Sequence, residues 1–143
     1  LYLHNMKHTE YLLQKQVCQY LNHQYPNVFF LSDTIANLKL SIPQQVRNNA
    51  IQKKNFHCPD LLILEPDNTY NGLFIELKTA TPYKLNGEIK ASSKDHLLNQ
   101  QKTILKLNEK GYKSFFAWDF ETIIKEIDNY LKLSNEISAP NRK

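Results

Sequence analysis

Two acidic residues and one lysine lie within otherwise apolar segments of this 143-residue chain. Asp60 opens the apolar run 61–64, and Glu76 and Lys78 belong to a second run, 73–78. Because charged side chains are costly to bury without partners, such placement indicates catalysis or metal binding. Paired carboxylates offer the oxygen ligands that Mg²⁺ and Mn²⁺ prefer, and a neighbouring lysine could stabilise developing negative charge. This combination of residue types predicts metal-dependent hydrolysis of a phosphodiester bond.

Strand geometry would bring these groups together. The segments 59–65 and 73–79 are predicted to form an antiparallel hairpin. Side chains two apart on a strand share a face, so Glu76 and Lys78 point the same way. The neighbouring strand, about 4.8 Å away, could bring Asp60 to that face. The backbone carbonyl between Glu76 and Lys78, that of Leu77, could add a further metal ligand.

The remaining elements follow from periodicity and from helix-end signals. Pro43 suits the first turn of a short helix, and Gly111 is expected to end the helix that starts near Ser92. Asn71-Gly72 is a strong turn dipeptide between the two central strands. The expected order is helix 7–24, strand 27–31, helix 43–52, strands 59–65 and 73–79, helix 92–111, strand 114–118 and helix 119–133. A four-stranded mixed sheet flanked by helices, in the order α-β-(α)-β-β-α-β-α, satisfies this pattern.

Length and composition indicate one globular domain. The domain is expected over residues 7–133, with a flexible N-terminus at 1–6 and a disordered tail at 134–143. The net charge of +4 and the pI of about 9.0 favour a polyanionic partner. Arg47 and Arg142 are the only arginines. Because bidentate base readout favours arginine, binding to phosphates is expected rather than sequence-specific readout.

Two cysteines, Cys18 and Cys58, do not make a disulfide framework. No apolar stretch approaches the roughly 18 residues that a membrane span requires, and no signal peptide is visible. We therefore expect a reducing, cytoplasmic setting and no membrane partner.

The segment Pro59-Asp60, followed by Glu76-Leu77-Lys78, resembles the motif of the PD-(D/E)xK nuclease superfamily. The order of the elements is most similar to the virus-type replication-repair nuclease (VRR-NUC) branch, which is close in plan to Holliday-junction resolvases. This resemblance implies a restriction-endonuclease-like core in a bacterial, phage or viral-type context. It also implies a Mg²⁺ cofactor, for which Mn²⁺ can substitute, and catalytic roles for the two acids and the lysine.

Further roles come from the same resemblance, which covers roughly residues 8–132. The branch has an acidic residue on its first helix, so Glu10 would help to hold the metal beside Asp60, Glu76 and the Leu77 carbonyl. A carboxylate favoured by the helix dipole is an equally good explanation of Glu10. The branch also has a supporting glutamine on the helix after the Glu-x-Lys strand. Gln100 fits that role, and Gln101 is the rival position.

The chain departs from the branch just before Pro59, where the family has small residues and this sequence has Phe56-His57-Cys58. We expect His57 to pack at the rim of the sheet, and spaced partners for a zinc site are missing. His96, one helical turn before Gln100, could support the site or be structural. Several lysines are expected to bind DNA phosphates: Lys53, Lys54, Lys84, Lys90 and Lys94.

The function expected from these features is that of an endonuclease selective for the structure of DNA. Branched, flap or junction DNA is the expected partner, in replication, repair or recombination, and a homodimer would supply two active sites. Two alternatives remain at this point. One is a nucleic-acid-binding module of the same fold that does not cleave, and the other is a sequence-specific restriction-type nuclease.

Overall fold

A computed structural model describes residues 2–35, 38–91 and 94–138, with side chains described for 9–35, 38–91 and 95–132. All eight expected elements are present in the expected order. They are α1 (Tyr2–Gln24), β1 (Phe30–Ser32), α2 (Ile42–Ile51), β2 (Leu61–Ile63), β3 (Leu73–Leu77), α3 (Lys94–Glu109), β4 (Lys113–Ala117) and α4 (Phe120–Ser138). Helix α1 begins before residue 7 and α4 continues beyond residue 133, so parts of both segments expected to be flexible are helical.

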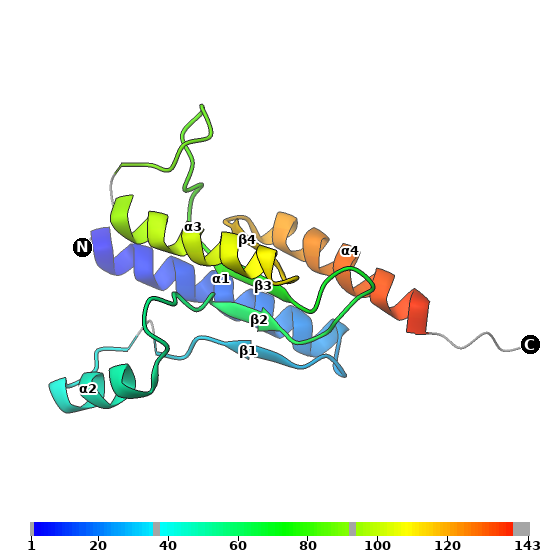
Figure 1. The fold of residues 1–143 in the computed structure, drawn as a ribbon, viewed down its shortest axis with the longest axis horizontal. Coiled ribbons are helices and arrows are strands. Elements are labelled where there is room, and N and C mark those ends of the chain that lie inside the picture. The colour runs from blue at the N-terminus through cyan, green and yellow to red at the C-terminus, as the bar shows by residue number, and fades with distance from the viewer. Residues whose placement is uncertain (1, 36–37, 92–93, 139–143) are drawn as a thin grey trace, which may run out of the picture.

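The four strands form one mixed sheet in the order β1-β2-β3-β4 (Figure 1). The pairs β1–β2 and β2–β3 are antiparallel, whereas β3 and β4 are parallel. The parallel pair requires a crossover connection, which α3 supplies. The predicted α/β class, with a restriction-endonuclease-like core, is therefore confirmed.

Alternate residues of β3 divide the sheet into two faces. Leu73, Ile75 and Leu77 are fully buried in the main core, between the sheet and helices α1 and α4. Glu76 belongs to the opposite face, with Phe116 beside it on β4. That second face is covered by α3 and by a smaller apolar cluster containing Ile89, Leu97, Ile104 and Phe116. Because both faces are covered, every residue of β3 is buried.

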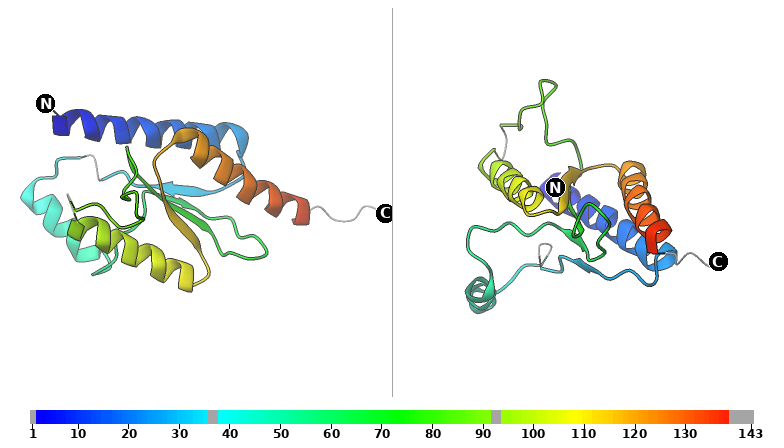
Figure 2. Two further views of the ribbon diagram at one scale, coloured as in Figure 1. Left: turned by 90° about the horizontal axis from the view of Figure 1, so that it is seen from above. Right: turned by 45° about the vertical axis from the view of Figure 1, so that its right-hand side comes forward.

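Local sequence signals explain most element ends. Ser41 and Gln44 form a reciprocal capping box at the start of α2, where Pro43 occupies the first turn. Gly111 follows the end of α3 with φ of +90°, a conformation that glycine adopts without strain. Helix α2 nevertheless buries none of its residues and stands apart from the sheet (Figures 1 and 2).

The connection between β2 and β3 does not turn at Asn71-Gly72 as predicted. The Asp67 carboxylate instead accepts hydrogen bonds from the backbone N–H groups of Thr69 and Tyr70, at 2.7 and 2.5 Å. The Asn71 N–H donates to the Gly111 carbonyl at 2.8 Å. The turn is therefore formed by the side chain of Asp67. The backbone hydrogen bond of Asn71 instead attaches the segment before β3 to the end of α3.

Candidate active site

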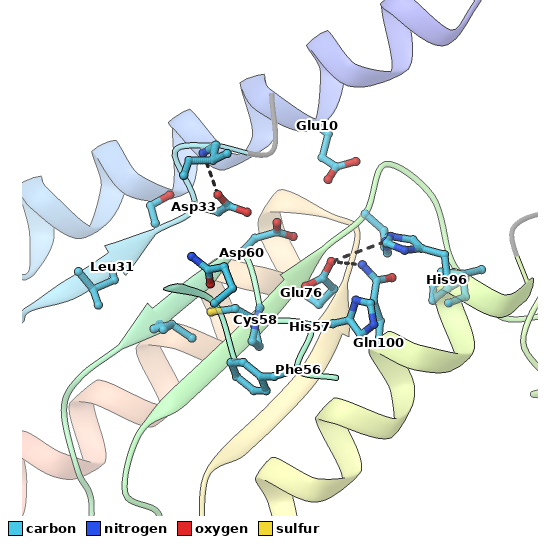
Figure 3. A pocket seen from close by; sticks show the side chains of 18 of the residues that line it. Glu10, Leu31, Asp33, Phe56, His57, Cys58, Asp60, Glu76, His96 and Gln100 are labelled. Carbon is cyan, nitrogen blue, oxygen red and sulfur yellow. Dashed lines mark hydrogen bonds and ion pairs between the residues drawn. The ribbon is translucent and has the colours of Figure 1, made fainter. Parts of the chain in front are cut away.

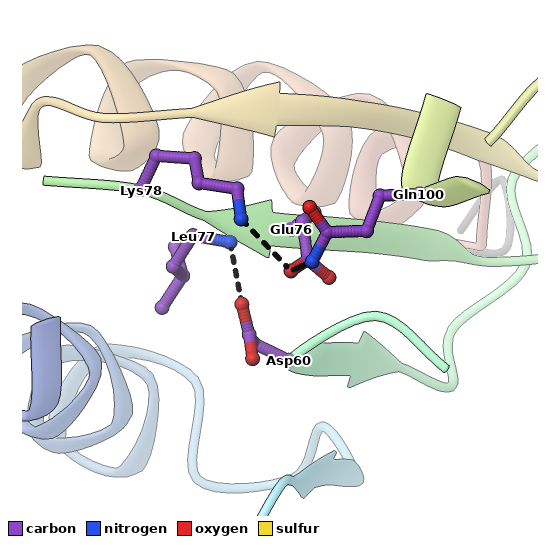
Figure 4. Close-up of polar contacts among 5 residues, drawn as sticks. All are labelled: Asp60, Glu76, Leu77, Lys78 and Gln100. Atoms are coloured by element: carbon purple, nitrogen blue, oxygen red, sulfur yellow. Dashed lines mark hydrogen bonds and ion pairs between the residues drawn. The ribbon is translucent and has the colours of Figure 1, made fainter. Parts of the chain in front are cut away.

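Strand register places Asp60 opposite Glu76. Leu61 pairs with Ile75 in the antiparallel β2–β3 ladder, so extending the ladder by one residue sets Asp60 across from Glu76. Directly opposed residues of antiparallel strands have side chains on the same face. Asp60 is 9% exposed and Glu76 is 6% exposed. The Asp60 Oδ2 atom accepts a hydrogen bond of 2.8 Å from the Leu77 N–H, which orients this carboxylate (Figure 4).

Lys78 and Gln100 converge on one oxygen of Glu76. The Lys78 Nζ atom lies 3.7 Å from Glu76 Oε1, and Gln100 Nε2 donates to the same oxygen at 2.5 Å (Figure 4). Lys78 also lies over the Phe116 ring, 5.9 Å from its centroid. Gln101 instead lines a separate small hollow near the 84–91 segment. The structure therefore brings Gln100 to Glu76 and leaves its rival elsewhere.

Burial, together with nearby negative charge, governs the electrostatics of this site. Burial, followed by the nearby Asp60 charge, raises the pKa of Glu76 to about 9, although Lys78 opposes this rise. Burial also raises the pKa of Asp60, against the opposing effects of the Leu77 N–H and Lys78. Without a further cation, the folded protein cannot readily hold both carboxylates in charged form.

Two more acids surround this pair. Burial and the charge of Asp60 raise the pKa of Glu10 on α1, and Figure 3 shows its carboxylate facing the pocket. Asp33, just after β1, was missed by sequence reasoning. Its N–H donates to the Asp60 carbonyl at 2.9 Å, and its charge helps to raise the pKa of Asp60. An acid directly after a predicted strand was the available signal, but the pairing of β1 with β2 was not known.

The donor set fits a hard divalent cation. Asp60 and Glu76 offer carboxylate oxygens, and the buried Oε1 atom of Gln100 has no hydrogen-bond partner among the described residues. Oxygen ligands of this kind suit Mg²⁺ or Mn²⁺. Among the described residues, no group of three or more His, Cys, Asp or Glu side chains is arranged to hold a metal. Glu10 is thus close enough to affect the carboxylate pair electrostatically but does not complete a ligand cluster with it.

An open groove of about 1470 Å³ surrounds these residues. Lys53, Lys54 and Lys90 line it, as do amide side chains from α2. Lys84 lies outside it and forms an ion pair with Glu88 at 3.7 Å. The side chain of Lys94 lies outside the described residues. The groove therefore brings together three of the five lysines predicted to bind DNA.

Two histidines line the same groove beside Gln100. The rings of His57 and His96 meet edge to face, 6.0 Å apart, and the His57 N–H donates to the Thr103 hydroxyl at 3.3 Å. Burial and the nearby Lys78 charge lower the pKa of His96. His57 was expected to pack at the sheet rim, and the contact with Thr103 attaches its backbone to α3.

A solved structure with a similar fold is described as "VRR_NUC domain protein". The two chains superpose with a TM-score of 0.57 at 22% sequence identity, over 88% of this chain and 90% of the other. No family model matches the sequence, and no curated protein matches it. The likeness shows that this chain shares the fold of that protein. In the described part of the chain, no helix has the length and apolar character needed to cross a membrane.

Proposed function

We propose that this chain is a Mg²⁺-dependent endonuclease that hydrolyses phosphodiester bonds of structured DNA. The supporting observation is the convergence of Asp60, Glu76 and Lys78, from two adjacent strands, in an open groove that also contains lysines. Buried like charges destabilise a fold unless a bound ligand offsets them, and such strained groups are typical of functional sites. A divalent ion bound at the two acids and a phosphate bound beside Lys78 account for this arrangement together.

Asp60 and Glu76 would hold the metal, with Glu10 and the Leu77 carbonyl as further candidates; Mn²⁺ would substitute for Mg²⁺. The bound ion would supply Lewis-acid stabilisation of phosphoryl oxygens and an acidified water molecule. The fixed hydrogen bonds from Leu77 and Gln100 keep the two carboxylates in place before the metal arrives. Such preorganisation lowers the cost of assembling the site during the reaction.

Lys78 has the position needed to act on the reacting phosphate. Its ammonium group touches Glu76 and is held over the Phe116 ring. In this role it orients the attacking water or stabilises the negative charge that develops on phosphoryl oxygens. Water attacks the phosphorus atom as the bond to the leaving sugar oxygen breaks. Lys53, Lys54 and Lys90 would hold neighbouring phosphates along the groove.

Preference for the structure of DNA, rather than its base sequence, is part of the proposal. Among the described residues, the groove is lined by lysines and amides but by no arginine. Lysine binds phosphate as a point charge without bidentate base readout. A domain this small has limited reach across a branched substrate, so we also propose a homodimer with two active sites. Sedimentation equilibrium would measure the oligomeric state.

A cleavage panel tests the proposed activity. Single-stranded, duplex, flap and four-way DNA would each be incubated with Mg²⁺, Mn²⁺ or EDTA. We expect cutting of branched forms with either metal and none in EDTA. Glu76→Gln should abolish cutting, whereas Glu109→Gln, at the exposed end of α3, should retain it. Full activity of Glu76→Gln would overturn the proposal. Binding of branched DNA without any cutting would support a non-cleaving module instead, and discrete fragments from plain duplex would indicate a restriction-type nuclease.

A further inference from the structure

The segment 52–58 carries aromatic side chains in the groove to which the proposed hydrolysis assigns no role. It connects α2 to β2, and every residue in it lines the groove that contains the paired acids. Lys53 and Lys54 come first, and Phe56 and His57 follow. Sites that bind single-stranded nucleic acid combine basic residues with aromatic ones in this way.

Phe56 is the unusual member of this segment. It is 41% exposed although it lies in the groove, and it belongs to neither apolar core cluster. Isolated exposed apolar residues are common on protein surfaces, so exposure alone carries no argument. Its position is informative, because Figure 3 shows Phe56 among the side chains that line the pocket, in the same loop as Cys58. The paired acids line the same groove.

The backbone holds this aromatic residue in place from both sides. Asn55 has φ of +58°, a left-handed conformation that asparagine tolerates better than most residues. On the other side, the His57 N–H bonds to Thr103 and the His57 ring meets His96. Phe56 therefore sits between a sharp turn and a residue anchored to α3, which limits the motion of the loop that bears it.

We infer that Phe56 stacks on an unpaired base of the DNA, with Lys53 and Lys54 holding the phosphates beside it. This inference rests on the proposed nuclease function and narrows its substrate to DNA with at least one unpaired nucleotide near the cut. The ring offers a flat apolar face that any base can cover. The aromatic face of a paired base is already covered by its neighbours in the duplex, so fully paired DNA gains nothing from this contact.

The chain length between Phe56 and Asp60 limits where that base can lie. Four residues span at most about 14 Å when fully extended, and stacked nucleotides rise about 3.4 Å each. A strand that runs directly from the paired acids to the Phe56 ring therefore places the contacted base within several nucleotides of the phosphate that is cut.

A double-mutant cycle tests this contact directly. Fluorescence anisotropy with Mg²⁺ would measure the Kd of flap DNA for two proteins that both carry Glu76→Gln. One keeps Phe56, and the other also carries Phe56→Ala. Each protein would be paired with flaps carrying one abasic site at each of four positions on either side of the junction. We expect Phe56→Ala to weaken binding of the intact flap about 5- to 150-fold. At one abasic position the two proteins should bind equally, because the stacking partner is already missing.

Further variants separate stacking from packing and folding. Phe56→Trp should keep the affinity, and Phe56→Leu, which fills similar space without an aromatic ring, should lose it as Phe56→Ala does. Phe29→Ala is the matched control, because Phe29 is 77% exposed and lies outside the groove. It should bind as the parent protein does. Circular dichroism would verify that each variant is folded.

Three results would overturn the inference. The first is that Phe56→Ala binds the intact flap with the Kd of the parent protein. The second is that Phe56→Ala weakens binding of fully paired duplex as much as binding of the flap. The third is that the effect of Phe56→Ala is the same at every abasic position. The outcome is separable from that of the proposed function. If the wild type cleaves DNA but the double-mutant cycle gives no coupling between Phe56 and any base, only the stacking inference is rejected. If the cycle shows coupling between Phe56 and one base but the wild type cleaves no DNA, the nuclease proposal is rejected and the stacking inference is retained.

Discussion

The two faces of the sheet differ in whether their buried side chains have complementary partners. On the face covered by α1 and α4, apolar residues such as Leu21, Ile75 and Ile127 are fully buried against one another. On the face that carries the groove, burial raises the pKa of both paired acids and the charge of Asp60 raises that of Glu76 further. A buried amide oxygen on the same face has no partner among the described residues. The first face supplies stability, whereas the second carries buried charge at some cost in stability, as the proposed function requires.

One strand serves both faces. In β3, Ile75 and Leu77 belong to the core, while Glu76 between them belongs to the site. Because side chains alternate along a strand, neighbouring substitutions should have opposite consequences. Changes on the core face should reduce stability, whereas changes on the groove face should remove activity and leave stability unchanged or higher.

The largest effect should come from the site itself. Asp60→Asn removes a charge from the paired acids and should abolish cleavage. Lys78→Met should lower the cleavage rate by about 10²- to 10³-fold, because one preorganised group that stabilises developing charge is lost. Single-turnover rates on flap DNA measure both. Lys125→Met, at an exposed position of α4, is the control, and an equal loss there would contradict the assignment.

A core substitution on the same strand should produce the opposite pattern. Ile75→Ala removes a fully buried side chain and should lower the free energy of unfolding by about 2–5 kcal/mol. Urea denaturation measures this value. Leu85→Ala changes a side chain that is fully exposed at a loop, so its effect should stay within about 0.5 kcal/mol. A loss for Leu85→Ala as large as that for Ile75→Ala would contradict the division between core and surface.

A smaller effect is expected where α1 meets α4. The Asp128 carboxylate accepts hydrogen bonds from Tyr20 and Tyr25, at 2.7 and 2.5 Å. Asp128→Ala leaves both hydroxyls without that acceptor and should cost about 1–3 kcal/mol, with the cleavage rate unchanged. Lys132→Ala removes a largely exposed ion pair to the same carboxylate, at 4.0 Å, and should cost about 0–1 kcal/mol. Loss of cleavage in folded Asp128→Ala would show that the two faces are not independent.

The last prediction concerns how steeply the free energy of unfolding changes with pH. The pKa of Glu76 is raised from 4.5 to about 9 in the folded protein, so the folded state binds a proton that the unfolded state releases between those values. That contribution to stability is complete below pH 4.5 and is lost as the pH rises through about 9. Glu76→Gln cannot titrate, although Asp60 and Glu10 still can, so its unfolding free energy should fall less between these limits.

Urea denaturation in EDTA, at several pH values from about 5 to 9, would measure this slope in both proteins. Saturating Mg²⁺ should reduce the slope of the wild type, because a bound cation stabilises the charged carboxylate. A steeper decline for Glu76→Gln than for the wild type would contradict the proposed charge balance at the site.

Local patterns were sufficient to predict the order of the elements. Apolar runs, Pro43 in the first turn of α2 and the stop at Gly111 act within a few residues of themselves, so no knowledge of distant contacts was needed. The turn between β2 and β3 was misplaced because two turn signals compete in that segment. Asp67 forms the turn, and Asn71 instead bonds to Gly111 across the fold.

The site was predictable only in part. Asp60, Glu76 and Lys78 were identifiable because charged residues in apolar runs stand out locally. The choice between Gln100 and Gln101 depended on how α3 is rotated against the sheet, which adjacent letters do not specify. Asp33 was missed because its proximity to Asp60 requires β1 to pair with β2.

The sequence by itself determined which residues could do chemistry and which segments would become strands and helices, since both depend on residue type and short-range spacing. The tertiary structure alone decided that Asp60 lies opposite Glu76, that Gln100 bonds to Glu76, and that Phe56 shares their groove. Register and helix rotation are set by the packing of the whole core, to which residues distant in the chain contribute at once.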